Sequence, residues 1–125
     1  GLKERSLRDL QISIDCSNPR IQGLATELLS GQDPKSKVEV GILLQSKDRD
    51  SVLSYPKNSE ISVLVIEKGA EIQSSLVRKV QVILTQGSVQ DEALKGFHGT
   101  LEKLECQYFD RTGLEEIRQK LDHII

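Results

Sequence analysis

The sequence of 125 residues contains no methionine and only two cysteines, Cys16 and Cys106. A small secreted domain held by disulfides needs more cysteines than this, so both thiols are expected to be reduced and buried in strands. No apolar run approaches the roughly 20 residues that a membrane-spanning helix requires, and no signal-peptide pattern is present. A disulfide framework and a membrane span are therefore not expected, and the chain is expected to be cytoplasmic.

The chain begins with Gly1 where a natural protein would begin with methionine. Gly1 is therefore interpreted as the scar of a tag, and residues 1–9 as a lead-in or linker. A single domain is expected at 10–125, as a segment of a larger protein. A chain of this size buries roughly two-thirds of its unfolded surface, which is enough for one hydrophobic core.

The charge is low and evenly spread. The formal net charge is −2, and lysine and arginine are not clustered. A surface for nucleic acid or phospholipid concentrates positive charge, so neither nucleic acid nor membrane contact is expected. No glycine-rich phosphate loop follows the first apolar segment, which argues against dinucleotide binding.

Apolar segments alternate with segments of helical periodicity. The apolar segments predict strands at 10–15, 38–44, 61–66, 80–85 and 105–109. The periodic segments predict helices at 19–30, capped by Asn18, at 48–55, at 70–79, at 89–103, and a last one capped by Thr112. Gly96 and Gly99 weaken the helix at 89–103. The alternation predicts an α/β fold, a three-layer sandwich around a mostly parallel five-stranded sheet, with its chemistry at the carboxyl ends of the strands.

Four strand ends carry polar residues in a characteristic order. They read Asp15-Cys16-Ser17-Asn18-Pro19, Val63-Leu64-Val65-Ile66-Glu67, Ile83-Leu84-Thr85 and Gln107-Tyr108-Phe109-Asp110. In this order and spacing the chain resembles a response-regulator receiver domain over nearly its whole length. The resemblance implies a flavodoxin-like βα repeat with the strand order 2-1-3-4-5.

The departures from the receiver pattern concern the residues that carry phosphotransfer in that family. Only Asp15 remains of the acidic pair, and Cys16 is a poor ligand for the hard cation Mg²⁺. Glu67 stands at the position of the phosphate-accepting aspartate, where its extra methylene misplaces the attacking oxygen. Gln107 stands at the lysine position, and only Thr85 matches. The resemblance therefore implies a degenerate receiver pocket, a pseudo-receiver that is not phosphorylated and holds no metal or cofactor.

Such a module is expected to act by docking rather than by catalysis. The predicted function is regulatory protein–protein interaction within a larger signalling protein, with a hybrid sensor histidine kinase as the host. The partners are then other domains of the same chain or a signalling protein. The resemblance implies a docking face around the fourth helix, fifth strand and fifth helix, with Phe97, Tyr108 and Phe109 as its candidate residues.

Two alternatives remain open at this point. The first is a receiver domain that is still phosphorylated, at Asp15 or Glu67. The second is a von Willebrand factor A-like ligand-binding domain, because Asp15-Cys16-Ser17 and Leu84-Thr85-Gln86-Gly87 are similar to two strand ends of that family. Pro19 and Gln86 replace a serine and an aspartate of the metal site there, so this alternative implies no bound metal.

Overall fold

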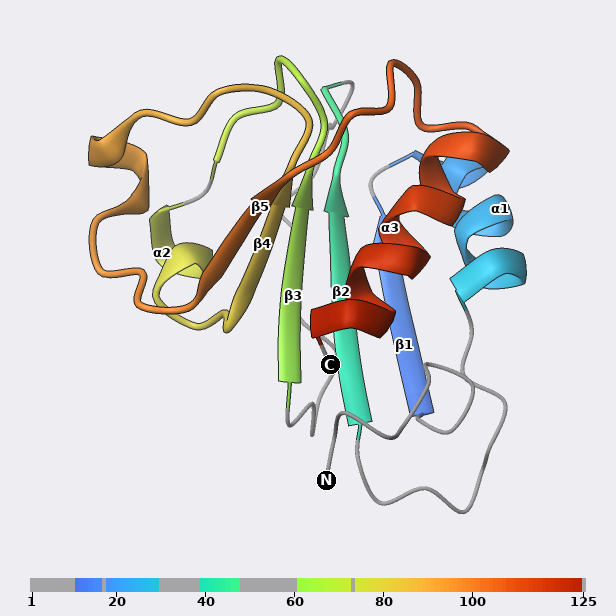
Figure 1. Cartoon of the computed structure of the whole chain (residues 1–125), viewed down its shortest axis with the longest axis horizontal. Helices are drawn as coiled ribbons and strands as arrows, with labels where there is room; N and C mark the ends of the chain where they lie inside the picture. Colours follow the sequence, from blue (N-terminus) through green and yellow to red (C-terminus); the bar gives the residue numbers. More distant parts are fainter. Residues whose placement is uncertain (1–10, 17, 30–38, 48–60, 73, 125) are drawn as a thin grey trace.

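The computed structural model describes residues 11–16, 18–29, 39–47, 61–72 and 74–124. Strands and helices alternate along the chain (Figure 1). In order they are β1 (Gln11–Cys16), α1 (Pro19–Leu29), β2 (Glu39–Gln45), β3 (Ile61–Ile66), α2 (Ser74–Val77), β4 (Val82–Thr85), the 3₁₀ helix η3 (Asp91–Leu94), β5 (Thr100–Lys103) and α3 (Arg111–Ile124). The expected lead-in at 1–9 and the expected helix at 48–55 lie outside the described residues.

The five strands form one sheet in which every pairing is parallel. Cys16 of β1 stands opposite Leu44 of β2, and Gln45 of β2 stands opposite Ile66 of β3. Ile66 in turn stands opposite Thr85 of β4. Because the strands run the same way, their carboxyl ends meet at one edge, which is the upper edge in Figure 1.

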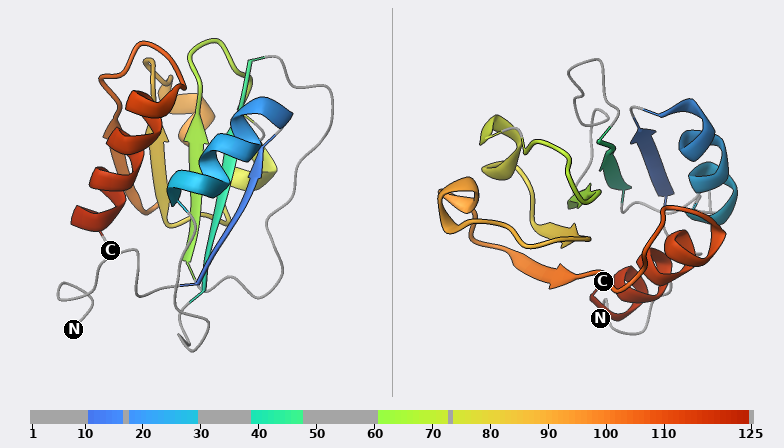
Figure 2. Two further views of the ribbon diagram at one scale, coloured as in Figure 1. Left: turned by 90° about the vertical axis from the view of Figure 1, so that its right-hand side faces the viewer. Right: turned by 90° about the horizontal axis from the view of Figure 1, so that it is seen from above.

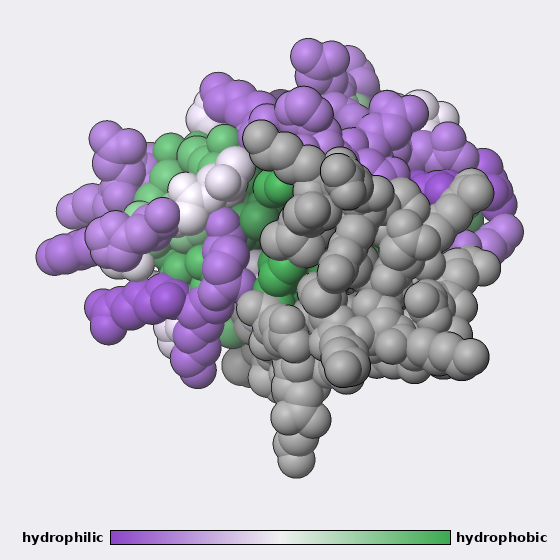
Figure 3. Space-filling view, turned by 60° about the horizontal axis from the view of Figure 1, so that its bottom comes forward, coloured by the Kyte–Doolittle hydropathy of each residue, from purple (hydrophilic) through white to green (hydrophobic). Residues whose placement is uncertain are grey.

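Helices cover both faces of the sheet (Figure 2). Ile21, Ala25 and Leu29 of α1 and Leu114, Ile117 and Leu121 of α3 join one hydrophobic cluster. Leu76 of α2 joins a second cluster, against which Leu94 of η3 also packs. Along β2, Val40, Ile42 and Leu44 belong to the first cluster and Leu43 to the second, as expected of a parallel strand covered on both sides. Seen from the lower end, apolar residues show between hydrophilic side chains (Figure 3). The predicted three-layer α/β sandwich, flavodoxin-like in its βα repeat, is confirmed.

The predicted strand order 2-1-3-4-5 is wrong. The observed order is β1-β2-β3-β4-β5, which puts β2 between β1 and β3 and leaves β1 at the edge. The burial agrees with this order: residues 40–44 are all buried, as on a central strand, whereas Ile12 and Ile14 of β1 are only partly buried, as on a strand with less cover. Strand–helix–strand connections between parallel strands are almost always right-handed. In a sheet where each strand is added on the same side of the one before, such connections would put all helices on one face. Here α1 and α2 cover opposite faces, so the structure departs from that rule.

The segment 89–103 is not the single helix that its periodicity predicts. It contains η3 and then β5, while the predicted strand at 105–109 is loop. Gly96 adopts a φ of +89°, and a Cβ on Gly99 would collide with the carbonyl oxygen of Gln81. The Thr100 N–H donates to that same oxygen (2.9 Å). The two glycines therefore end the helical segment and lay the chain beside β4. α2 is also shorter than the predicted helix at 70–79.

Polar side chains cap the two long helices. Asn18 Oδ1 accepts a hydrogen bond from the Arg20 N–H (3.0 Å), which confirms the predicted cap of α1. At α3 the cap is Asp110 rather than Thr112, because Asp110 Oδ1 accepts from the Gly113 N–H (3.1 Å). Both helices run back from the carboxyl edge along the same face of the sheet.

α1 and α3 pack against each other as well as against the sheet. Ala25 and Leu29 of α1 share a cluster with Leu114, Ile117 and Leu121 of α3, and all five side chains are almost completely buried. The Arg111 guanidinium and the Glu27 carboxylate add an exposed ion pair between the helices (3.4 Å). Exposed pairs contribute little, so apolar burial holds α3 in place.

Replacing Leu121 by alanine should lower the free energy of unfolding by about 2–5 kcal/mol, because a fully buried leucine leaves a cavity when it is truncated. Leu101→Ala is the matched control, since Leu101 is 41% exposed, and it should cost less than about 1 kcal/mol. Urea unfolding followed by far-UV circular dichroism measures both values. Equal losses in the two variants would contradict the described packing of α3.

Candidate functional site at the carboxyl edge of the sheet

The carboxyl edge collects four of the five pocket residues predicted from sequence. Asp15 and Cys16 end β1, Glu67 directly follows β3, and Thr85 ends β4. Glu67 and Thr85 come from neighbouring strands, whereas β2 stands between β1 and β3. The two acidic residues of the predicted pocket therefore do not arise from adjacent strands.

The Glu67 carboxylate binds the end of β2. Its Oε1 accepts hydrogen bonds from the Ser46 hydroxyl (2.9 Å) and from the Lys47 N–H (2.8 Å). The Glu67 N–H donates to the Gln45 carbonyl (2.9 Å), which continues the β2–β3 pairing by one residue. Bonds from a hydroxyl and an amide to a carboxylate are charge-assisted and hold it in one orientation. One oxygen of the predicted acceptor residue is thus committed to the neighbouring loop.

The Thr85 hydroxyl is engaged within its own loop. It donates to the Gly87 carbonyl (2.8 Å) and lies 3.3 Å from the Gly87 N–H, which donates to it. This local arrangement shapes the turn after β4. Thr85 is buried. The threonine expected at the receiver position therefore stabilises the turn after β4.

Glu67 and Thr85 line one small cavity of about 190 Å³ between the loops that follow β3 and β4. Lys68 and Gly69 contribute one wall, and Gly87 and Ser88 contribute the other. Gly69 has a φ of +89°, which the first loop requires and a side chain would oppose. The cavity is large enough for a small ion or group, and its charged side chains have opposite signs.

Gln86 ties three loops together, a role that sequence reasoning missed. Its Oε1 accepts from the Lys68 N–H (2.8 Å), and its Nε2 donates to the Cys106 carbonyl (3.0 Å). The side chain therefore links the loops after β3, β4 and β5. The only signal in the sequence is a polar residue directly after a strand, which does not reveal its partners.

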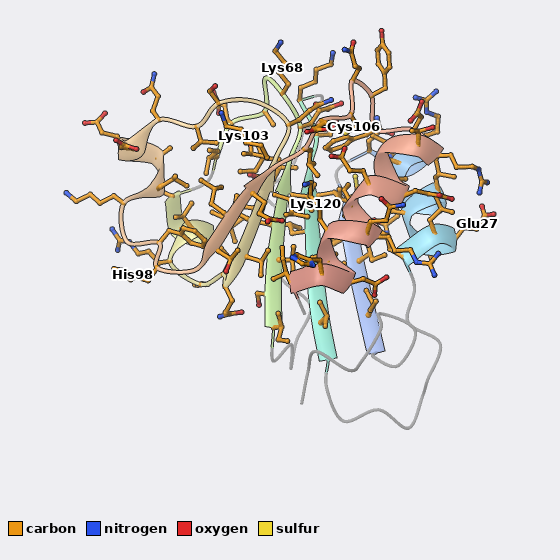
Figure 4. All side chains as sticks on the ribbon, viewed as in Figure 1. Glu27, Lys68, His98, Lys103, Cys106 and Lys120 are labelled. Atoms are coloured by element: carbon orange, nitrogen blue, oxygen red, sulfur yellow. The ribbon has the colours of Figure 1, made fainter. Side chains whose placement is uncertain are left out.

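Gln107 does not line the cavity of Glu67 and Thr85. β5 ends at Lys103, so Gln107 does not follow the fifth strand directly. It is exposed and lines a second cavity, of about 270 Å³, together with Lys68, Gln86 and Cys106. Figure 4 shows Lys68 and Cys106 near this upper edge. Neither this cavity nor the one beside Glu67 is lined by Asp15 or Cys16.

Gln45 is a second polar residue that sequence reasoning missed. Its side chain is 0% exposed at the end of β2, and neither amide atom has a hydrogen-bond partner among the described residues. A buried unpaired amide costs about 1–3 kcal/mol. The end of β2 therefore carries an unfavourable buried group beside the Glu67 backbone.

Both cysteines are free. Burial raises the pKa of the buried Cys16 thiol, while the Asn18 N–H bond to Sγ (3.5 Å) opposes this and the charges of Asp15 and Glu67 add to it. Burial, and then the negative charge of Glu116, raises the pKa of the partly buried Cys106 thiol to about 11. Neither thiol is set up as a nucleophile, since reactive cysteines have lowered pKa values.

The loop that carries Cys106 is held by α3. Glu116 Oε2 accepts from the Glu105 N–H (2.7 Å), and Oε1 accepts from the Cys106 N–H (2.8 Å). Both carboxylate oxygens therefore satisfy loop amides. Like Glu67 and Thr85, this acidic residue stabilises backbone rather than presenting a free group.

The three residues of the predicted docking face do not share one surface. Phe109 is only 5% exposed and belongs to the core on the α1–α3 face, so it is not available for docking. Phe97 packs against the cluster on the opposite face. Tyr108 is 72% exposed. The predicted face is therefore not formed, because the fifth strand does not run where the sequence pattern placed it.

Comparisons with protein-family models, with curated proteins and with solved structures found no match to this chain. Among the described residues, no group of three or more histidine, cysteine, aspartate or glutamate side chains is placed to hold a metal ion. No helix in the described part of the chain is long and apolar enough to cross a membrane. Ser17, on which the von Willebrand A-like alternative depends, lies outside the described residues.

Replacing Gln86 by leucine should lower the free energy of unfolding by about 1–2 kcal/mol, because two hydrogen bonds between loops are lost. Hydrogen exchange should become faster at the Lys68 amide, which donates to Gln86. Gln90→Leu is the matched control, since the exposed Gln90 side chain makes no capping bond at η3. Unchanged exchange at Lys68 in the Gln86 variant would show that Gln86 does not tie the loops in solution.

Native Cys106 should be alkylated by iodoacetamide only slowly near pH 8. With a pKa of about 11 it carries little thiolate there, and its rate should rise until about pH 11, whereas the rate in denaturant should level off near 9. Because the folded pKa is the higher one, the stabilisation from this group is present below pH 9 and is lost as the pH rises toward 11. Timed alkylation with peptide-resolved mass spectrometry separates Cys106 from Cys16. A native plateau near pH 9 would be inconsistent with the described burial.

Proposed function

We propose that this domain is a non-catalytic, receiver-like interaction module of a larger cytoplasmic signalling protein, with a hybrid sensor histidine kinase as its host. The observation that carries the proposal is the hydrogen bonding of the Glu67 carboxylate. Its Oε1 is bound by Ser46 and by the Lys47 N–H, and β2 separates it from Asp15. The residue at the acceptor position thus contributes to the fold of the carboxyl edge.

The requirements of phosphotransfer support this proposal. The reaction needs oxygen ligands that converge on a divalent cation, an acceptor carboxylate aligned for attack, and a cation that neutralises the phosphoryl group. Asp15 and Cys16 do not line the cavity of Glu67 and Thr85, and Gln107 lines a different one. A domain with this arrangement keeps the folded scaffold and acts through contacts with other proteins or other domains of its own chain.

A second candidate is a receiver domain that can still be phosphorylated. One observation favours it: Glu67 and Thr85 line the same cavity, together with Lys68. In this alternative the Glu67 oxygen that is not bound to Ser46 would accept the phosphoryl group. The extra methylene of glutamate and the distance of Asp15 across β2 argue against efficient transfer.

Titration with Mg²⁺ and beryllofluoride, followed by backbone amide shifts, tests the proposal. Beryllofluoride imitates a phosphoryl group on an acceptor carboxylate, so we expect no saturable shift at Asp15, Glu67 or Thr85. A phosphorylatable receiver titrated with the same solutions verifies the probe, and Glu67→Gln identifies shifts that do not depend on the carboxylate. Saturable shifts at Glu67 and Thr85 that disappear in Glu67→Gln would overturn the proposal in favour of the second candidate.

A further inference from the structure

Exposed basic side chains gather at the amino ends of β4 and β5, away from the carboxyl edge. Arg78 and Lys79 follow α2, while Lys95 and His98 follow η3, and all four are exposed. Figure 4 shows His98 at the lower left, with Lys68 of the carboxyl edge at the top. This group of side chains therefore lies on a part of the molecule that the candidate site does not use.

Two backbone segments are in direct contact there. The Arg78 Cγ lies 3.0 Å from the point where a Cβ of Gly96 would stand, so the Arg78 stem lies against the turn after η3. Gly99 lies directly on the Gln81 carbonyl, to which the Thr100 N–H also donates. These contacts bring Arg78 and the turn that begins with Lys95 side by side, although they come from different elements.

Partly exposed apolar side chains come from the same part of the chain and from β5. Leu101 of β5 is 41% exposed and stands opposite Ile83 of β4. Ile83 belongs to the second hydrophobic cluster, on the face of the sheet that α2 and η3 cover. Leu94 and Phe97 pack against that cluster and are only partly buried. On the left of Figure 3, apolar residues show between projecting hydrophilic side chains. We define the basic–apolar surface as Arg78, Lys79, Leu94, Lys95, Phe97, His98 and Leu101.

The basic groups of this surface have no ion-pair partner within the part of the chain that the structure describes. The exposed parts of Leu94, Phe97 and Leu101 would lose water on contact with an apolar partner. Together they suit a partner segment in which carboxylates flank apolar residues, because opposite charges orient the encounter and apolar contact holds it. Asp91 and Glu92 on the adjacent η3 confine the positive charge to a short stretch, which suits a short segment with few carboxylates better than the continuous phosphates of a nucleic-acid backbone.

We propose that the basic–apolar surface docks an acidic segment of a partner protein that also carries apolar residues. This inference rests on the proposed function as an interaction module and supplies the surface and partner chemistry for it. It also replaces the predicted face around Phe109, whose ring is buried. Phe97 is the one residue that the two surfaces share.

The test uses the whole chain and a synthetic 12-residue peptide that repeats Asp-Glu-Leu. Amide shifts should saturate at residues 78–79 and 94–101, and the affinity should fall as salt is added. The double variant Arg78→Gln/Lys95→Glu should weaken binding at least about tenfold, since it removes two attractive charges and adds a repulsive one. Glutamine keeps the Cγ that contacts Gly96, so the turn is retained. Lys120→Glu, on α3 at the opposite face of the sheet, is the matched control and should bind unchanged.

Three outcomes would overturn this inference. They are a failure of the peptide to saturate, equal binding by the double variant and the control, and tighter binding of a 12-base-pair DNA duplex than of the peptide. A polyglutamate peptide that binds equally well would remove the apolar part of the proposal. If the peptide does not bind and beryllofluoride causes no shifts, this surface is wrong but the proposed function as an interaction module is retained. If beryllofluoride causes saturable shifts, the proposed function is overturned whatever the result with the peptide.

Discussion

The parallel pairing of β2 with both β1 and β3 is the constraint on which the rest of the structure depends. It buries β2 on both faces and moves β1 to the edge. Neighbouring strands lie about 4.8 Å apart, so Asp15 and Glu67 start from strands roughly 10 Å apart. The side chain of Glu67 therefore meets the end of β2, at Ser46 and the Lys47 N–H, before it can meet β1.

The carboxyl edge uses its polar side chains mainly to satisfy backbone groups. Glu67 and Glu116 accept from loop N–H groups, Thr85 closes its own turn, and Gln86 joins three loops. Each of these bonds stabilises the edge and removes an oxygen or nitrogen from other chemistry. The same polar atoms could serve either structure or chemistry, and in the described contacts they stabilise the loops.

The two ends of the sheet consequently differ in character. At the carboxyl end, the carboxylates of Glu67 and Glu116 are bound by loop N–H groups, and the cavities beside Glu67 and Gln107 measure about 190 and 270 Å³. At the amino ends of β4 and β5, basic groups and a half-exposed leucine face outward without such pairing in the described chain. This difference fits the proposed interaction module, whose contacts with partners would lie away from the carboxyl edge.

Local periodicity and capping are enough to predict the α/β class, the bounds of β3, the cap of α1 at Asn18 and a last helix near the C-terminus. The sequence also identifies Glu67 and Thr85 as residues at strand ends. The strand order, the end of β5 at Lys103, the burial of Phe109 and the partners of Glu67 and Gln86 are known only from the three-dimensional structure. These features depend on which distant segments pair and on close approaches such as that of Gly99 to Gln81, and no local pattern encodes the free energy of such long-range contacts.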